Sequence, residues 1–262
     1  MIQLKSKAEI EILRENAELI NEFLGELIRA AQPGVSTAEL DQLAESLMAK
    51  AGVTSAFKGY RGFPASICAS INEEIVHGIP SPDRVLREGD LLSVDTGFAR
   101  QGLYADKGDT VVVGTPTEET AELIGVAREA LWRGIDQARH GRRVGDISHA
   151  IGSHVAERGY RAVRRFVGHG IGREMHEDPQ IPNEGEPGRG PKLKAGMVVA
   201  IEPMVWKRDP HDDGTDEEWV ADDDWTVLTP NGQRSAHVEE MVLITKGKPE
   251  VLTATDKSEG WS

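Results

Sequence analysis

The chain has 262 residues, of which 44 are acidic and 30 basic, so its formal net charge is −14 at pH 7. Hydrophobic residues make up 39%, which is typical of a soluble globular protein, and the acidic balance argues against a nucleic-acid coat or a membrane-surface binder. A single cysteine, Cys68, excludes a disulfide framework and a cysteine-based zinc finger. No apolar run approaches the ~20 residues of a transmembrane helix and the N-terminus has no signal-peptide pattern, so we expect a cytoplasmic protein.

The first half of the chain is predicted to form two helices followed by strands. Capping-box pairs, Ser6 with Glu9 and Ser36 with Glu39, each precede a stretch with apolar residues at helical spacing. The stops of these helices are a Pro-Gly pair at residues 33–34 and a glycine at residue 52. Three strands are expected next, over residues 65–71, 91–98 and 110–113.

The second half is predicted to repeat this order. One helix is expected over residues 118–140, and another is expected to be capped by Asp146 and to end at Gly159. Its strands are expected over residues 162–167, 197–201 and 238–245. A Pro-Asn-Gly turn predicts a hairpin between residues 225–228 and the last of these strands.

This order of elements bears on the fold class. Helices and strands cluster rather than alternate one for one, which favours an α+β fold over a doubly wound sheet. No linker rich in Pro, Gly or Ser divides the chain. We therefore expect a single domain over residues 1–262 with a two-fold pattern, in halves of about 6–113 and 118–245.

Three patterns suggest ligands but have simpler explanations. Residues 168–172 (GHGIG) resemble a dinucleotide fingerprint, but Met175 stands where its third glycine is needed. Residues 176–180 (HEDPQ) begin like a zinc-binding helix motif but lack its second histidine. Nine acidic residues between positions 209 and 224 are expected to form a solvated loop, because they lack the ordered spacing of a calcium-binding loop.

Two aspartates are predicted to meet across a hairpin. Asp95 lies within an apolar strand, where a carboxylate is costly unless it is paired or bound to a metal. Asp106 follows after a turn at residues 100–102, and a hairpin of this length returns it to the neighbourhood of Asp95. Close carboxylates repel each other, and a cation between them relieves the repulsion.

Other candidate ligands also end or interrupt apolar strands. They are Glu202, Glu239 and His169, the last between two glycines that let the backbone come close. A single acid is more often part of a buried salt bridge, but four carboxylates and an imidazole are harder to explain in that way. This oxygen-rich set suits Mn²⁺, Fe²⁺ or Co²⁺, with Zn²⁺ as a further candidate, and suits two ions better than one.

In the order and spacing of its motifs, the sequence resembles the type I methionine aminopeptidases over nearly its whole length. The motifs are residues 72–80 (NEEIVHGIP), the Asp95/Asp106 pair, and residues 168–172 (GHGIG), 176–179 (HEDP), 200–204 (AIEPM) and 224–226 (DWT). The resemblance implies a pita-bread fold, with pseudo-two-fold halves around a curved antiparallel sheet, in the short bacterial-type form. It implies a metal-dependent aminopeptidase that removes the initiator methionine from nascent polypeptides, through attack of a metal-bound hydroxide on the scissile carbonyl.

The resemblance also implies roles for the metal-site residues. Asp106 and Glu239 would bridge two divalent metal ions. His169 and Glu202 would complete the shell of one ion, and Asp95 would hold the other. Glu202 would in addition accept the proton of the attacking water and return it to the leaving amine.

The same resemblance implies a substrate site beside the metals. His77 would contact the substrate near its leaving side, and His176 would hydrogen-bond the carbonyl and stabilise the developing negative charge. The side chains implied to line the methionine pocket are Tyr60, Phe63, Cys68, Met175 and Trp225.

Four positions depart from the family's pattern. Glu240 stands where the family usually has histidine, and related proline-peptide hydrolases often carry an acid there. Lys107 stands where small residues are commoner and is expected to point to solvent. Asp109 is a weaker rival ligand, and Met175 replaces an aromatic residue.

Two alternatives remain beside the favoured function: a proline-directed peptidase, and a catalytically silent binding protein on the same fold. The second typically loses ligands, and all five are present here. The partners expected are peptides with N-terminal methionine and nascent chains, with transient ribosome contact. We expect a monomer that binds neither DNA nor membranes.

Overall fold

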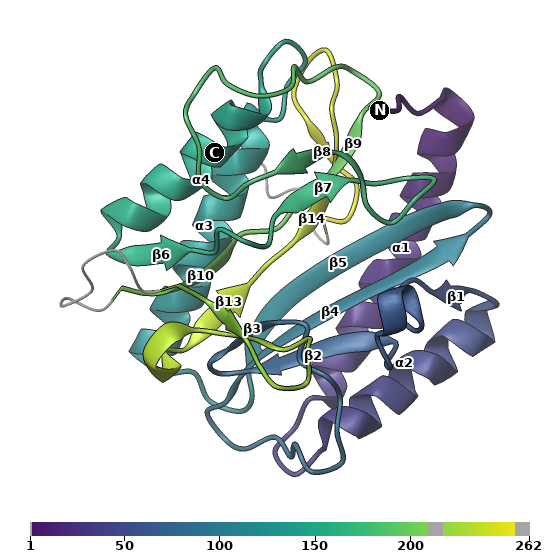
Figure 1. Cartoon of the computed structure of the whole chain (residues 1–262). Coiled ribbons are helices and arrows are strands. Elements are labelled where there is room, and N and C mark those ends of the chain that lie inside the picture. The colour runs from purple at the N-terminus through teal and green to yellow at the C-terminus, as the bar shows by residue number, and fades with distance from the viewer. Residues whose placement is uncertain (1, 209–216, 255–262) are drawn as a thin grey trace.

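The computed structural model describes residues 2–208 and 217–254 (Figure 1). Within these ranges, no helix is long and apolar enough to cross a membrane. Residues 209–216 of the predicted acidic loop, with four of its nine acids, lie outside the described residues. Glu218 is buried, and its carboxylate accepts hydrogen bonds from the backbone N–H groups of Arg164 and Arg165 at 3.2 and 2.8 Å. For this acid, the prediction of a solvated side chain is wrong.

Two capped helices begin the chain, as predicted. Helix α1 (Lys7–Ala30) follows Ser6 and helix α2 (Thr37–Ala51) follows Ser36, and both capping boxes are formed. The strands that follow are β1 (Thr54–Ser55), β2 (Ile67–Ile71), β3 (Glu74–Val76), β4 (Leu91–Arg100) and β5 (Leu103–Val112), with a short 3₁₀ helix at Tyr60–Gly62.

The second half again starts with two helices, α3 (Glu118–Gln137) and α4 (Val144–Glu157). The cap of α4 is Arg143 rather than the predicted Asp146, whose carboxylate instead accepts the Arg143 backbone N–H from the first turn. The strands of this half are β6 (Tyr160–Ala162), β7 (Gly168–Gly170), β8 (Glu177–Ile181), β9 (Val198–Ile201), β10 (Met204–Lys207), β11 (Trp219–Val220), β12 (Val227–Leu228), β13 (Ser235–His237), β14 (Glu240–Leu243) and β15 (Glu250–Val251).

The strands form antiparallel sheets flanked by two helix pairs. In the first half β4 pairs with β1, β2 and β5, and in the second the order is β15-β14-β9-β7-β8. Figure 1 shows α1 and α2 on one side of the strands and α3 and α4 on the other. Helix α1 packs on β4 and β5, while α3 and α4 pack on each other and on strands of the second half. The predicted α+β class is confirmed.

The two halves meet where β5 lies beside β13 and β14. The backbone N–H of Glu239 donates to the carbonyl of Gly108 at 2.9 Å. The Thr110 hydroxyl donates to the His237 carbonyl at 2.7 Å and accepts the His237 backbone N–H at 2.9 Å. This seam places residues from both halves next to each other at the middle of the molecule.

Three strand predictions are wrong. The strand expected over residues 162–167 lies earlier in the chain, as β6 (Tyr160–Ala162). Strand β5 starts at Leu103 rather than at residue 110, because its polar and charged residues hid the strand pattern. The predicted hairpin of residues 225–228 with the last strand does not form: β12 pairs with β11 and β3, while β13 pairs with β10. The Pro-Asn-Gly segment is a 3₁₀ turn between two different sheets.

Candidate metal centre and substrate pocket

The hairpin of β4 and β5 brings the two aspartates to one face of the first sheet. Asp95 is the register partner of Gly108, and Asp106 is the partner of Gly97, two residues further along β4. Residues two apart on a strand share a face, so both carboxylates point to the same side. The two aspartates therefore meet across the hairpin, as their spacing in the sequence predicts.

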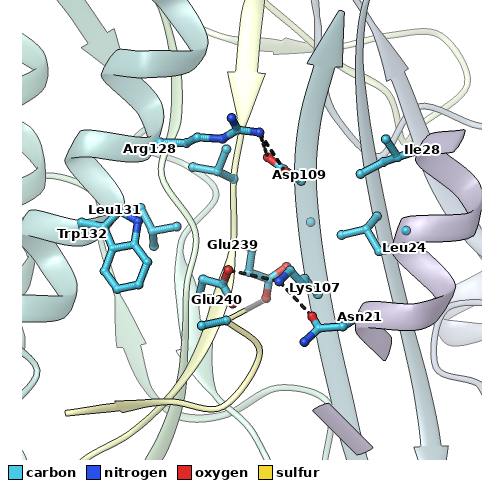
Figure 2. A pocket seen from close by; sticks show the side chains of 14 residues that line it. Asn21, Leu24, Ile28, Lys107, Asp109, Arg128, Leu131, Trp132, Glu239 and Glu240 are labelled. Carbon is cyan, nitrogen blue, oxygen red and sulfur yellow. Dashed lines mark hydrogen bonds and ion pairs between the residues drawn. The ribbon is translucent and has the colours of Figure 1, made fainter. Parts of the chain in front are cut away.

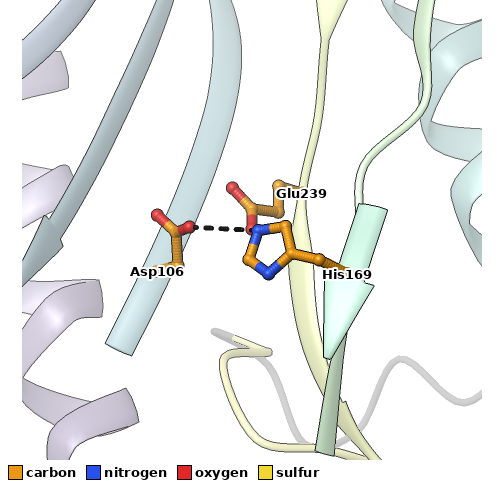
Figure 3. Close-up of side chains that lie close together, drawn as sticks. All are labelled: Asp106, His169 and Glu239. Carbon is orange, nitrogen blue, oxygen red and sulfur yellow. Dashed lines mark ion pairs between the residues drawn. The ribbon is translucent and has the colours of Figure 1, made fainter. Parts of the chain in front are cut away.

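The second half supplies the other candidate ligands. His169 on β7 lies opposite Ala200 of β9, and Glu202 follows the end of β9. One ligand atom each from Asp106, His169 and Glu239 lies within 4.8 Å of the others (Figure 3). His169 Nε2 is 3.8 Å from Asp106 Oδ2 and 3.5 Å from Glu202 Oε1. Four of the predicted ligands thus converge, and Asp95 lies on the adjacent strand.

Glycines on both sides of His169 allow this convergence. A Cβ on Gly168 would come within 2.5 Å of the Ala200 carbonyl oxygen, and one on Gly170 within 2.3 Å of the Asp178 carbonyl oxygen. His169 Nδ1 lies 2.9 Å from the Gly170 carbonyl oxygen. An N–H on Nδ1 that donates to this carbonyl leaves the lone pair of Nε2 facing the carboxylates, which is the arrangement of a metal-binding imidazole.

The carboxylates of this cluster lack ordinary partners. Asp95 Oδ1, Asp106 Oδ1 and Glu239 Oε1 are buried without a hydrogen bond among the described residues. Burial raises the pKa of Asp95 to about 7. Burial, and then the neighbouring Asp95, raise the pKa of Asp106, and burial with Asp106 raises the pKa of Glu239. Hard oxygen donors beside one imidazole, buried with free lone pairs, fit divalent cations.

A cluster of apolar and aromatic side chains adjoins the candidate ligands, because Cys68 on β2 is the register partner of Asp95 on β4. Phe63, Cys68 and Met175 are buried in one apolar cluster, and Trp225 packs against it. The Phe63 and Trp225 rings meet edge to face with centroids 5.1 Å apart. Burial raises the pKa of the Cys68 thiol, so this side chain acts as a small apolar wall. Tyr60 is half-buried and lies beside His176.

His176 lies between Tyr60 and the candidate ligand His169. Its ring centroid is 4.3 Å from that of His169 and 5.2 Å from that of Tyr60, whose hydroxyl oxygen lies 3.0 Å from His176 Nδ1. Burial lowers the pKa of His176 to about 4. The imidazole is therefore neutral near pH 7 and can present an N–H to a substrate oxygen.

His77 lies beside Trp225 and has a strained backbone conformation. Its backbone φ of 61° lies in the left-handed region, which is uncommon for a residue with a side chain. Its ring meets Phe166 and Trp225 edge to face, at 5.3 and 6.0 Å between centroids. Burial lowers the pKa of His77 to about 4, so this imidazole is also neutral at pH 7.

Sequence reasoning missed two residues at this site. His237 is buried, with Nε2 at 3.6 Å from Glu202 Oε2, and Phe166 packs on His77. A signal for His237 exists, because it stands two residues before Glu239 and a strand places such residues on one face. No pattern in the sequence marks Phe166, whose contact depends on the fold.

The departures from the family's pattern have specific structural outcomes. Lys107 is only 5% exposed, so the expectation that it points to solvent is wrong. Its ammonium instead lies 3.1 Å from Glu240 Oε1. Asp109 pairs with Arg128 at 3.0 Å on the same face of β5 as Lys107, away from the metal ligands. Met175 is buried in the same apolar cluster as Phe63 and Cys68.

Comparison with known proteins places this arrangement in one family. Residues 11–246 match metallopeptidase family M24. The chain is 51% identical over 253 residues to a methionine aminopeptidase of Clostridium acetobutylicum, with 97% of this chain and 99% of that protein aligned. The sequence-based family resemblance is therefore confirmed.

Solved structures agree on the fold. The crystal structure of methionine aminopeptidase from Thermotoga maritima superposes with a TM-score of 0.91 at 42% identity, over 97% of this chain and 99% of that one. Prolidase from Pyrococcus furiosus superposes with a TM-score of 0.78 at 26% identity, over 97% of this chain but 66% of that one. The pita-bread prediction is thus confirmed, and the fold is one on which more than one peptidase specificity exists.

Proposed function

This chain belongs to metallopeptidase family M24, and we propose that it is a metal-dependent aminopeptidase that releases N-terminal methionine from polypeptides. The observation that carries this proposal is the buried meeting of Asp106, His169 and Glu239, with unpartnered carboxylate oxygens beside an apolar and aromatic cluster. Asp106 and Glu239 would bridge two divalent ions, with Asp95 on one side and His169 and Glu202 on the other.

The metal ions would supply the Lewis acidity that activates water near neutral pH and polarises the scissile carbonyl. The chain's own residues would move protons and hold the substrate. Glu202, which contacts both His169 and His237, would accept a proton from water and return it to the leaving amine. His176, neutral and 4.3 Å between ring centroids from His169, would donate an N–H to the carbonyl oxygen as negative charge develops.

The substrate's methionine side chain would enter the pocket of Phe63, Cys68, Met175 and Trp225. Sulfur packs favourably against aromatic rings and against other sulfur atoms. Tyr60 and His77 would close the rim, with His77 facing the leaving side of the substrate. Met175 is unbranched and adaptable, and it would give this wall a softer surface than the aromatic residue usual in the family.

Several finer properties belong to the same proposal. We infer Mn²⁺, Fe²⁺ or Co²⁺ as the working ions, with Zn²⁺ as a further candidate, because the donor set is mostly oxygen. The protein would act as a cytoplasmic monomer of one catalytic domain on nascent chains, with transient ribosome contact.

The test is hydrolysis of a Met-Ala-Ser peptide by metal-stripped protein, with Mn²⁺, Fe²⁺, Co²⁺ or Zn²⁺ restored separately under anaerobic conditions. Release of methionine that depends on the added metal is the expected result. Tight metal binding without hydrolysis would contradict the proposed activity and would favour a silent binding protein.

A second candidate, a proline-directed peptidase, has one observation in its favour: Glu240 is an acid at a position where such hydrolases often carry one. An X-Pro peptide assayed in parallel separates the two. Faster cleavage of the X-Pro peptide than of Met-Ala-Ser would reverse the ranking.

A further inference from the structure

A buried ion pair lies directly behind the bridging carboxylates. Asp106 and Lys107 are neighbours on β5, and Glu239 immediately precedes Glu240 at the start of β14. Because successive side chains of a strand point to opposite faces, Lys107 and Glu240 lie on the reverse side of the ligand-bearing face. Figure 2 shows their contact from that side, where Lys107 Nζ is 3.1 Å from Glu240 Oε1.

The Lys107 ammonium is fully hydrogen-bonded. It has three N–H donors, and its acceptors are Glu240, the Asn21 side-chain oxygen at 2.9 Å and the Thr253 carbonyl. These partners come from β14, from α1 and from the segment after β15. The side chain of Lys107 is only 6% exposed and that of Glu240 13%, so the pair is largely shielded from solvent where it lines the pocket drawn in Figure 2.

Glu240 is held from its other oxygen as well. The Thr253 hydroxyl donates to Glu240 Oε2, and the same hydroxyl accepts the backbone N–H of Met241 at 2.8 Å. The sulfur of Met241 lies 3.3 Å from the backbone nitrogen of Asp106. The contacts therefore form a closed ring that begins and ends on the two strands carrying the bridging ligands.

We propose that Lys107 and Glu240 are positioning residues, which lock β5 to β14 so that Asp106 and Glu239 keep the separation that two metal ions require. This inference rests on the proposed metal centre. It also explains two departures from the family's pattern together. Lys107 replaces a small residue and Glu240 replaces a histidine, and the two new side chains form an ion pair with each other. Mutation of residues that orient metal ligands typically changes metal affinity by about 10- to 100-fold.

Mn²⁺ titration of the metal-stripped full chain, followed by calorimetry, tests this inference. K107M and E240Q should each weaken Mn²⁺ binding about 10-fold or more. The double variant K107M/E240Q should lose no more than either single variant, because the residues act as one unit. R128M, which breaks the neighbouring Asp109 pair on the same face, is the matched control and should bind Mn²⁺ as the wild type does.

The signs of the two single variants exclude a purely electrostatic explanation. If charge alone acted through space, loss of the Lys107 cation would tighten Mn²⁺ binding and only loss of the Glu240 anion would weaken it. Tighter binding by K107M would therefore overturn the proposal. So would wild-type affinity in a variant whose thermal unfolding is destabilised, since the pair would then serve stability alone.

Two further outcomes are distinguishable. Should K107M not fold, K107M/E240Q removes both charges together and carries the test, and wild-type affinity in that variant would overturn the proposal. Wild-type protein that takes up no Mn²⁺ would contradict the metal centre itself. Wild-type protein that binds two Mn²⁺ ions while both pair variants match it would contradict the positioning role alone.

Discussion

The two faces of the β5–β14 seam differ in whether their buried charged groups are paired. On one face Asp106 and Glu239 have carboxylate oxygens without partners among the described residues. On the other face, one residue along each strand, Lys107 and Glu240 neutralise each other. A buried charge is costly unless it is paired, so the first face is arranged for cations that the chain itself does not supply. Buried acids without partners, such as Asp106 and Glu239, therefore indicate a binding site, whereas buried charges that pair with each other, such as Lys107 and Glu240, indicate a structural role.

The largest effect is expected where a bridging carboxylate is lost. Asp106→Asn should abolish binding of two Mn²⁺ ions and peptide hydrolysis together, because the amide cannot bridge two cations as a carboxylate does. Metal content and Met-Ala-Ser turnover measure both effects. The matched control is Asp109→Asn on the paired face of the same strand, which should keep both properties. Full turnover by D106N would remove Asp106 from the site.

A smaller loss is expected for the proposed proton carrier. Glu202→Gln keeps the shape of the side chain but removes its basicity, so kcat for Met-Ala-Ser should fall by about 10²- to 10⁴-fold. The assay needs saturating Mn²⁺, because Glu202 is also a proposed ligand. Unchanged kcat at full metal occupancy would assign the proton transfer to another group.

The unpaired face also predicts an unusual pH dependence for the metal-stripped protein. Burial raises the pKa of Asp95 to about 7 and raises those of Asp106 and Glu239 above their ordinary values. The folded state then holds protons that the unfolded chain has lost, so the free energy of unfolding should rise as the pH falls from 9 to 7. The slope is at most about 1.4 kcal/mol per pH unit for each extra proton.

Two histidines act in the opposite sense below that range. Burial lowers the pKa values of His77 and His176 to about 4, so below about pH 6.5 the unfolded chain takes up protons at these two positions first, which offsets part of the rise from the carboxylates. Urea denaturation of metal-stripped protein at pH 9, 8 and 7 measures the upper window. Asp95→Asn should flatten the rise, whereas stability that is flat in the unsubstituted protein would contradict the charge imbalance.

The smallest effect is expected at the exposed end of the paired face. Asp109 and Arg128 form an ion pair in which the side chains are 27% and 50% exposed. Arg128→Met should reduce the free energy of unfolding by only about 0.2–1 kcal/mol, as is usual for pairs near the surface. Thermal unfolding measures this change, and a simultaneous loss of Mn²⁺ affinity would contradict the separation of the two faces.

The helices were predictable because their signals are local. The capping boxes at Ser6 and Ser36 and the apolar spacing behind them placed α1 and α2 correctly. Strand β5 was located only in its last residues, since a strand with charged residues on both faces lacks the alternation that marks a half-buried strand. The hairpin predicted at residues 230–232 failed because strand pairing there depends on distant partners, β3 and β10.

The candidate site shows the same division between local and distant information. Single strands pointed to Asp95, Asp106 and Glu239, and the family resemblance supplied roles that spacing alone does not give. The partner of Lys107 could not be read from the sequence, because Glu240 lies far along the chain and reaches it only through the seam between the halves. His237 was missed although its alternation with Glu239 was visible.

The seam between the halves also sets when the protein can become active during its own synthesis. Asp95 and Asp106 emerge early from a ribosome, but Glu239, and the Thr253 carbonyl that holds Lys107, emerge last of the groups described at the site. A chain translated only as far as β9 has neither Glu239, the second proposed bridging ligand, nor the Lys107–Glu240 pair behind it. The proposed processing of other new chains therefore starts only once this chain has been made as far as Thr253.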